Sequence, residues 1–337
     1  MIPLLYLPED SLNNVLEMMD KMSLMFFSML SSRTVTLIKK LKLELKNFTV
    51  DFKGRVCLRL KFKDGDGIEI YLDTNGYSYD LGMLYSRKIK VRLTAGLQNK
   101  LYFDLDFPNV RDWIDHLHNV YSYQYVDLTF FELRTLRYSF ESIVRTLEGI
   151  PIQVLHVTNG YDVFRRVLHY FPTPRLLNLF GRVLPGSQPA PCSEFMAKLL
   201  IQNFDALYFH SSIPFTLDSL LMMNSPFLWT LASKLTDREL NMYIRFWMNN
   251  PTSKLESLGL GYDSFRVFNK DVILKGIDYI ERQSDLRRDF QFSIDFHPYH
   301  GHCACFYGGY DITRRDGTNC SISIDSEDST FQMFVWP

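Results

Sequence analysis

The chain has 337 residues, 46% of them hydrophobic and 15% aromatic, and a formal net charge of −1. This length and composition allow a large buried core and two or more domains, and they exclude an intrinsically disordered chain. The nearly balanced charge provides no global attraction to nucleic acid or to an anionic membrane surface. No apolar run reaches the ~20 residues that span a bilayer. We therefore expect neither a nucleic-acid nor a membrane partner.

The cysteines are odd in number and scattered, unlike the dense disulfide framework of a small secreted domain. They are Cys57, Cys192, Cys303, Cys305 and Cys320. The sequence also opens without the basic and apolar pattern of a secretory signal. We expect free thiols and a cytoplasmic location, with the nucleus as the alternative.

The first stretch, residues 7–38, predicts three short helices. Pro8 suits the first position of the first helix, Ser23 is expected to cap the second, and Ser31 or Ser32 the third. Apolar residues follow the spacing of one helix face at Leu12, Val15, Leu16 and Met19. Three helices of this size bury too little surface alone. Part of their apolar surface must therefore face a partner or the rest of the chain.

This stretch resembles the F-box pattern without gaps. The matching positions are Leu7, Pro8, Leu12, Val15, Leu16, Asp20, Leu24, Leu30, Ser31, Arg33, Leu37 and Ile38. Two positions depart from the pattern: Lys21 stands where Pro is common, and Thr34 stands where many members carry Trp. The second departure resembles the Ser-x-Arg-Thr variant of F-box B proteins, a family much expanded in nematodes.

The resemblance implies that these helices dock on the Skp-type adaptor of a cullin ubiquitin ligase. It places the adaptor-binding surface on Leu7, Pro8, Leu12, Val15, Leu16, Leu24 and Phe27.

From about residue 45 the apolar pattern changes to the alternation of strands, over residues 48–52, 56–62, 68–72 and 89–93. The Asp-Gly pairs in residues 63–67 predict a tight hairpin turn. A second turn is expected at Thr74, Asn75 and Gly76. Asp64, Asp66 and Glu69 are spaced like the start of a calcium-binding loop, but its Gly, its final Glu and its flanking helices are missing. The turn is therefore the favoured interpretation.

Residues 110–262 alternate short apolar runs with helical stretches. The runs pair Leu155 with Val157, Leu177 with Leu179, Leu207 with Phe209 and Leu258 with Leu260, and their first members lie 22, 30 and 51 residues apart. Residues 229–231 fall near the midpoint of the long interval. Helices are expected at 140–147, 163–171, 193–200, 217–223 and 237–248. This spacing favours an irregular leucine-rich-repeat-like array, while an ordinary α/β domain of βα units would look similar.

Residues 235–260 resemble the F-box-associated type 2 domain, in which Leu-Thr, a helix with Asn and Trp, and a Leu-Glu-x-Leu strand follow in order. The matching positions are Leu235, Thr236, Asn241, Trp247, Leu255, Glu256 and Leu258. The turn after the helix departs from the usual one. The tail, with Tyr310, Asp311 and the alternating Cys320, Ile322 and Ile324, resembles the family's final hairpin.

The expected fold class is α/β. We expect an F-box over residues 1–42, a β-rich section over 43–108, the F-box-associated repeat-like region over 109–265, and a C-terminal helix with a β-hairpin over 266–337.

The densest set of metal-ligand types could hold zinc, but it lacks the usual paired Cys-x-x-Cys spacing. It consists of His297, His300, His302, Cys303 and Cys305. A loop and hairpin edge is the favoured interpretation, and whether the set binds metal stays open. No nucleotide-binding glycine loop or hydrolase motif occurs, so we expect no cofactor and no enzyme. Arg145, Arg165, Arg166 and Arg175 form a mild basic cluster, interpreted as a solvated face.

We therefore predict a substrate receptor of a Skp-cullin-F-box ubiquitin ligase, whose protein target the sequence does not identify. The alternative is a scaffold protein outside the ligase, with F-box-like helices that pack on its own repeats. An unrecognised hydrolase is a third possibility.

Overall fold

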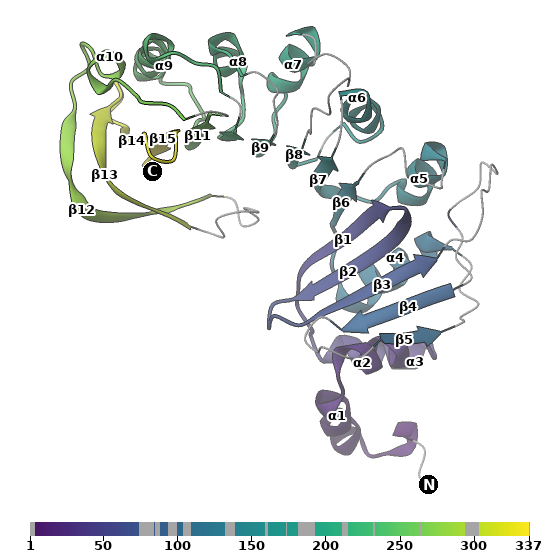
Figure 1. Ribbon diagram of the computed structural model, residues 1–337. Coiled ribbons are helices and arrows are strands. Elements are labelled where there is room, and N and C mark those ends of the chain that lie inside the picture. Colours follow the sequence, from purple (N-terminus) through teal and green to yellow (C-terminus); the bar gives the residue numbers. More distant parts are fainter. Residues whose placement is uncertain are drawn as a thin grey trace. The chain divides into compact units, whose positions relative to one another are not determined.

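The structure, a computed structural model, divides into two compact units, Met1–His156 and Val157–Pro337 (Figure 1). It describes residues 4–73, 84, 88–93, 100–103, 109–131, 139–158, 161–172, 174–180, 193–210, 215–231, 233–262, 265–293 and 303–336. The expected α/β class is confirmed, with helices first, then alternating strands and helices, then strands. In the described part, no helix combines the length and the apolar content needed to cross a membrane. The expected four-part division stays a prediction.

The N-terminal unit begins with the predicted helices. They are η1 (Leu4–Tyr6), α1 (Glu9–Met18), α2 (Lys21–Ser28) and α3 (Ser32–Lys40). Pro8 occupies the N-cap of α1, one residue before the expected position. The cap predicted at Ser23 is wrong, because Asp20 caps α2 and accepts hydrogen bonds from the N–H groups of Met22 and Ser23. Ser31 caps α3, as predicted.

The sheet of the N-terminal unit contains the predicted alternating strands. They are β1 (Leu45–Lys53), β2 (Arg55–Phe62), β3 (Gly67–Asp73), β4 (Lys88–Leu93), β5 (Lys100–Phe103), β6 (Val126–Phe130) and β7 (Ile152–Thr158), the last of which carries the unit boundary. Strands β1 to β5 are antiparallel neighbours, and β6 joins β1 in parallel. The turn between β2 and β3 confirms the predicted hairpin, with Gly65 at a φ of 98°. The turn expected at Thr74 lies outside the described residues.

Two helices, α4 (Val110–Tyr121) and α5 (Phe140–Leu147), cover the apolar face of this sheet. Phe62 meets Tyr121 of α4 edge to face at 5.4 Å between ring centroids, and Phe130 lies 5.8 Å from Phe140 of α5. On the same face of the sheet, five neighbouring strands each contribute one fully buried residue to a row in register. The row is Leu128, Val50, Leu58, Ile70 and Val91.

The C-terminal unit repeats strand and helix in the predicted places. Its elements are α6 (Tyr161–Tyr170), β8 (Leu176–Phe180), α7 (Ser193–Leu200), β9 (Ala206–Phe209), α8 (Leu217–Met222), β10 (Phe227–Thr230), α9 (Asp237–Asn249) and β11 (Ser257–Gly261). Strand β10 supplies the repeat expected at residues 229–231. Together with α5 of the N-terminal unit, these helices confirm all five predicted ones, and α5 and α7 have the predicted bounds.

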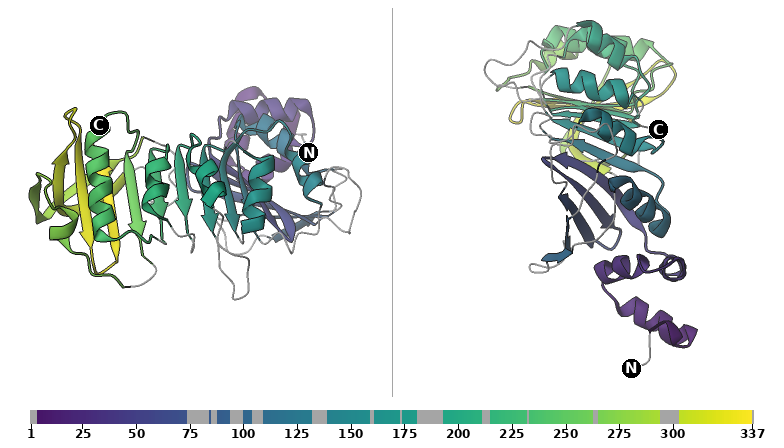
Figure 2. Two further views of the ribbon diagram at one scale, coloured as in Figure 1. Left: turned by 90° about the horizontal axis from the view of Figure 1, so that it is seen from above. Right: turned by 90° about the vertical axis from the view of Figure 1, so that its right-hand side faces the viewer.

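Strands β8 to β11 are parallel and carry matched leucines in register, on Leu177, Leu207, Leu228 and Leu258. Helices α6 to α9 cover the face that these leucines occupy (Figures 1 and 2). On that side Phe215, just before α8, lies 5.5 Å from Phe209. On the opposite face of the sheet the described residues form no helix, and we call it the helix-free face of the C-terminal unit.

After β11 the strand direction reverses. Strand β15 (Thr330–Val335) pairs antiparallel with β11, and β14 (Asn319–Asp325), β13 (Cys303–Thr313) and β12 (Ile280–Gln291) follow outward. The β14–β15 pair confirms the predicted final hairpin. The expected C-terminal helix is the four-residue α10 (Lys270–Ile273), and the long strand β12 was not anticipated.

Candidate protein-interaction site

The first candidate site is formed by helices α1 to α3. Of the seven predicted adaptor-binding residues, Pro8 and Val15 are exposed and Leu7 is half-buried. The other four are buried within the chain, and they are Leu12, Leu16, Leu24 and Phe27. Those four side chains therefore support the helices from inside, and a direct contact with an adaptor stays a prediction for all seven.

Three further apolar side chains of this region, Met18, Tyr6 and Leu30, are more exposed than the predicted Val15. Met18 is 88% exposed, Tyr6 81%, Leu30 72% and Val15 37%. Helical spacing places Val15 and Met18 next to each other, at i and i+3 of α1. It does not indicate which apolar side chains the rest of the chain leaves exposed. We call Tyr6, Val15, Met18 and Leu30 the exposed F-box residues.

Helices α2 and α3 pack against the rest of the N-terminal unit. From α2, the Ser28 hydroxyl lies 2.8 Å from Nε2 of His116 on α4. From α3, Lys39 Nζ donates to Asn119 Oδ1 at 2.6 Å. Burial lowers the pKa of His116, so the ring is neutral near pH 7 and forms a neutral hydrogen bond. Part of the apolar surface that three helices cannot bury alone is therefore covered by α4.

The two departures from the F-box pattern both have local structural roles. Lys21 Nζ lies 3.0 Å from Asp64 in the β2–β3 turn and 5.4 Å from the centroid of the Phe62 ring. Thr34 is fully buried and completes a capping box with Ser31. Lys21 thus links α2 to the β2–β3 turn, and Thr34 stabilises the start of α3.

The second candidate site is the helix-free face of the C-terminal unit. One row of residues in register crosses five strands, and it reads Asn178, Tyr208, Trp229, Gly259 and Gln332. A Cβ atom built on Gly259 would lie 2.0 Å from Trp229 Cε3, so the indole lies directly against the backbone of Gly259. Nearby, the rings of Phe180 and His210 stack at 4.3 Å.

One end of this face is covered by the β12–β13 hairpin. Phe290 of β12 lies within 5.5 Å of the Phe334 and Trp336 rings, and Phe306 of β13 stacks on Phe334 at 4.9 Å. Arg288 lies over Phe306 and donates to Asp311 Oδ1 at 2.6 Å. The pKa of the Asp311 carboxyl is lowered, because hydrogen bonds from Ser321 and Arg288 outweigh its burial.

Helix α9 is attached to its surroundings on both its outer and its buried side. Thr236 and Glu239 form a capping box at its start. On its outer side, Asn241 and Arg245 donate to the carbonyl oxygen of Lys275, at 3.0 and 2.8 Å. At its buried side, the Arg314 guanidinium lies 5.1 Å from the Trp247 ring centroid. The segment that carries the second sequence resemblance is therefore a framework element.

The sequence-level candidates for catalysis and metal binding are placed as follows. His297, His300 and His302 lie outside the described residues, while Cys303 and Cys305 are on β13. Over the described ranges, no three residues of His, Cys, Asp or Glu lie together as metal ligands. The carboxylates of the calcium alternative point to other partners: Asp64 to Lys21 and Glu69 to Arg59.

The described thiols are free and show no activation. Cys57, Cys305 and Cys320 form no disulfide. Burial raises the pKa of Cys57 to about 12 and raises that of Cys320. The hydrogen bond with Asp289, with a smaller part from desolvation, raises the pKa of Cys305. A nucleophilic cysteine requires a lowered pKa, so none of these three is prepared for that role.

The N-terminal unit also holds two buried carboxyl groups on the face away from α4. Asp51 lies 2.7 Å from Arg59, and burial raises its pKa. Burial raises the pKa of Asp127 to about 7, against hydrogen bonds from Val154 and Asn47. Register places both in a polar patch with Thr49 and Thr129. Burial outweighs the protein partners of both groups and disfavours their ionised form, and both lie within the sheet framework.

Two family models match the chain in the two regions where the sequence showed a family resemblance. Residues 4–46 match the F-box domain, and residues 196–260, from within α7 to β11, match the F-box associated family FBA_2. No curated protein and no solved structure matches the chain significantly. The expansion in nematodes stays a prediction. The chain therefore combines an N-terminal F-box with an F-box-associated type 2 domain.

Proposed function

We propose that the chain is a substrate receptor of a Skp-cullin-F-box ubiquitin ligase. The presence of an F-box and an F-box-associated match on one chain is the observation that supports this role. The F-box helices would bind the Skp-type adaptor, and the C-terminal unit would bind a protein target. The chain itself would perform no bond chemistry. It would raise the effective concentration of a target lysine near the conjugating enzyme.

The exposed F-box residues are the proposed direct contacts with the adaptor. An interface usually draws its affinity from a few large apolar anchors, and Met18 and Tyr6 are the most exposed of these side chains. The buried Leu12, Leu16, Leu24 and Phe27 would act by shaping the helices. A cytoplasmic or nuclear location is part of the proposal.

Co-purification with a Skp-type adaptor tests this role. We expect the wild-type chain to capture the adaptor and a Val15→Glu, Met18→Glu double variant to lose at least tenfold in capture. Met242→Glu, which changes an equally apolar exposed residue on α9, is the matched control and should capture normally. Failure of the wild type to capture the adaptor, or normal capture by the double variant, would contradict the proposal. Thermal melts of all variants verify folding.

The packing of α2 and α3 on α4 favours one second candidate, a scaffold protein outside the ligase. In that case the F-box helices serve only to complete the N-terminal unit. The scaffold predicts that the wild type captures no adaptor, although its fold is intact. The same co-purification therefore separates the two functions.

A further inference from the structure

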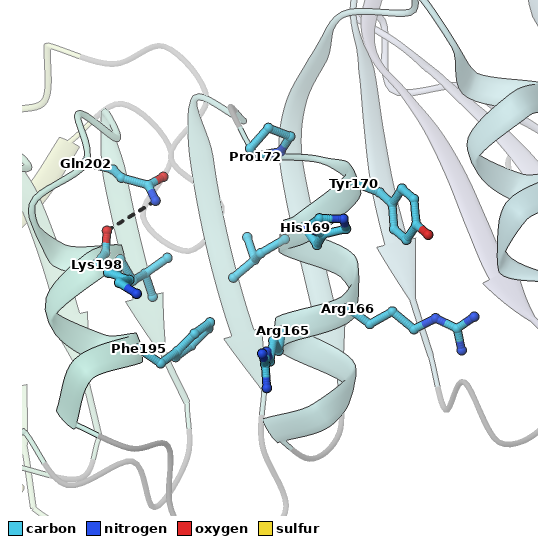
Figure 3. Close-up of a pocket in the computed structure, with 10 residues that line it drawn as sticks. Arg165, Arg166, His169, Tyr170, Pro172, Phe195, Lys198 and Gln202 are labelled. Atoms are coloured by element: carbon cyan, nitrogen blue, oxygen red, sulfur yellow. Dashed lines mark hydrogen bonds between the residues drawn. The ribbon is translucent and has the colours of Figure 1, made fainter.

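A groove lies between α6 and α7 in the helix layer of the C-terminal unit (Figure 3). Its volume of about 640 Å³ falls within the range of ligand-binding pockets. Arg165 and His169 project from α6, and Phe195 and Lys198 project from α7. The groove is therefore built from the side chains of two neighbouring repeats.

Both helices contribute the same pattern to this groove. Arg165, Leu168 and His169 occupy positions i, i+3 and i+4 of α6, which lie on one helix face. Phe195, Lys198 and Leu199 occupy the same three positions of α7. Leu199 is buried, and Leu168 and Phe195 are half-buried. The groove thus has an apolar floor with a basic side chain on each wall.

The charge of the groove has one sign. Among the described residues that line it, none carries a carboxylate. Lys198 Nζ lies 2.6 Å from Glu194 Oε1, but both side chains are more than two thirds exposed, and such surface pairs contribute little. Within the described part of the chain Arg165 forms no direct ion pair, although the same exposed Glu194 carboxylate also attracts it electrostatically. Both cations are therefore able to pair with an incoming anion.

The basic cluster noticed in the sequence is divided by the fold. Arg175 pairs with Asp205 at 2.6 Å, and Arg145 belongs to the N-terminal unit. Arg166 also lines the groove but extends away from α7 (Figure 3). Lys198, which the sequence cluster omitted, completes the basic pair with Arg165.

We propose that this groove binds an acidic peptide segment of the protein target. A bulky apolar side chain of the peptide rests on Leu168, Phe195 and Leu199, and flanking carboxylates pair with Arg165 and Lys198. The inference deepens the proposed function, on which it rests for the identity of the partner as a ligase target. Nucleic acid fits less well, because its binding needs several phosphate contacts and stacking aromatics, and this groove offers a largely aliphatic floor.

A labelled peptide tests the proposal with the full-length chain. The probe is a fluorescein-labelled decapeptide with Leu and Phe at its centre and glutamates on both sides. We expect saturable binding in fluorescence anisotropy that weakens with added salt. An Arg165→Glu, Lys198→Glu double variant should bind at least tenfold more weakly. The matched control is Arg238→Glu with Lys254→Glu, which makes the same charge change on exposed residues away from the groove.

Two further probes separate the contributions. Replacing the glutamates by glutamines removes the charge, and replacing Leu and Phe by alanines removes the apolar anchor, so each should weaken binding at least tenfold. No saturable wild-type binding up to about 1 mM, or equal loss in both double variants, would overturn the proposal. Tighter, groove-dependent binding of a labelled oligouridine RNA would overturn it as well.

The adaptor measurement distinguishes this inference from the proposed function. The Arg165→Glu, Lys198→Glu variant should capture the Skp-type adaptor as well as the wild type does. Loss of peptide binding with normal adaptor capture assigns the effect to the groove. Peptide binding without any adaptor capture would support the proposed peptide-binding groove and contradict the proposed ligase function.

Discussion

The face of the N-terminal sheet away from α4 and the helix-free face of the C-terminal unit are built from different chemistry. In the N-terminal unit, Arg59 joins the carboxylates of Asp51 and Glu69 at 2.7 and 3.2 Å, and the Tyr71 hydroxyl donates to Glu69 at 2.6 Å. In the C-terminal unit, the corresponding face carries Trp229 against Gly259 and the aromatic cluster around Phe290. The opposite, helix-covered faces of both sheets are alike, with rows of buried aliphatic residues.

The helix-covered faces are built alike in both units and define the fold. The opposite faces are stabilised by different interactions, charged in one unit and aromatic in the other. Ion pairs and hydrogen bonds depend on pH and tolerate water, whereas ring packing depends on close shape complementarity. Substitutions on the two faces should therefore change the stability of the protein in different ways. Four substitutions test this difference.

The largest expected effect is that of Phe290→Ala in the aromatic cluster. Phe290 is buried between Phe292, Phe334 and Trp336, and its removal leaves a cavity that costs about 3–5 kcal/mol. Urea denaturation should show a matching loss in the free energy of unfolding of the C-terminal unit. Leu286→Ala, on the same strand but exposed, is the control and should have little effect. Equal losses would mean that the cluster is not packed as described.

Gly259→Ala should be the next most damaging substitution. Its new methyl group would lie 2.0 Å from the Trp229 ring, and such overpacking costs about 1–3 kcal/mol. In a Trp229→Ala background the same substitution should cost almost nothing, because the obstructing ring is gone. A double-mutant cycle in thermal unfolding measures this coupling. Additive effects would contradict the close contact.

Asp127→Asn should change how stability depends on pH. The folded pKa of Asp127, about 7, is raised above its ordinary value of 3.8, so its contribution to stability is full below about pH 4 and declines as the pH rises to 7. The variant lacks this decline and should lose roughly 3 kcal/mol less than the wild type between pH 4 and pH 7. Denaturation at a series of pH values measures both slopes. Parallel slopes would show that the carboxyl is ionised without penalty.

The smallest effect is expected for Tyr71→Phe in the charged network. The substitution removes the hydroxyl that donates a hydrogen bond to Glu69, which costs about 1 kcal/mol. Urea denaturation of the N-terminal unit provides the measurement. A loss as large as that of Phe290→Ala would place this network among the main sources of stability and remove the contrast between the faces.

Most of the repeat architecture could be predicted from the sequence, because burial on one face imposes a period. Leu177, Leu207 and Leu258 marked β8, β9 and β11, and Trp229 marked the strand that the spacing required. In the structure, Thr216 and Thr236 cap the starts of α8 and α9.

The failures have specific physical causes. Strand β12 is exposed on both faces over most of its length, so its polar sequence has no period to detect. Serine often caps helices, which favoured Ser23. However, Asp20 lies one turn earlier, and its side chain accepts hydrogen bonds from two backbone N–H groups. Helical spacing also placed Leu16 and Leu24 correctly on an apolar face, yet it could not distinguish a face that packs inside the chain from one left for a partner.

The reversal of strand direction at β11 also limits how this fold can change in length. A further parallel repeat needs a free parallel edge, and β15 occupies that edge of β11 in the antiparallel direction. The hairpin beyond it cannot be displaced without exposing Phe290 and Phe306. Gains or losses of whole βα repeats are therefore confined to positions before β11, where neighbouring strands share one direction. Length variation among relatives should be sought there.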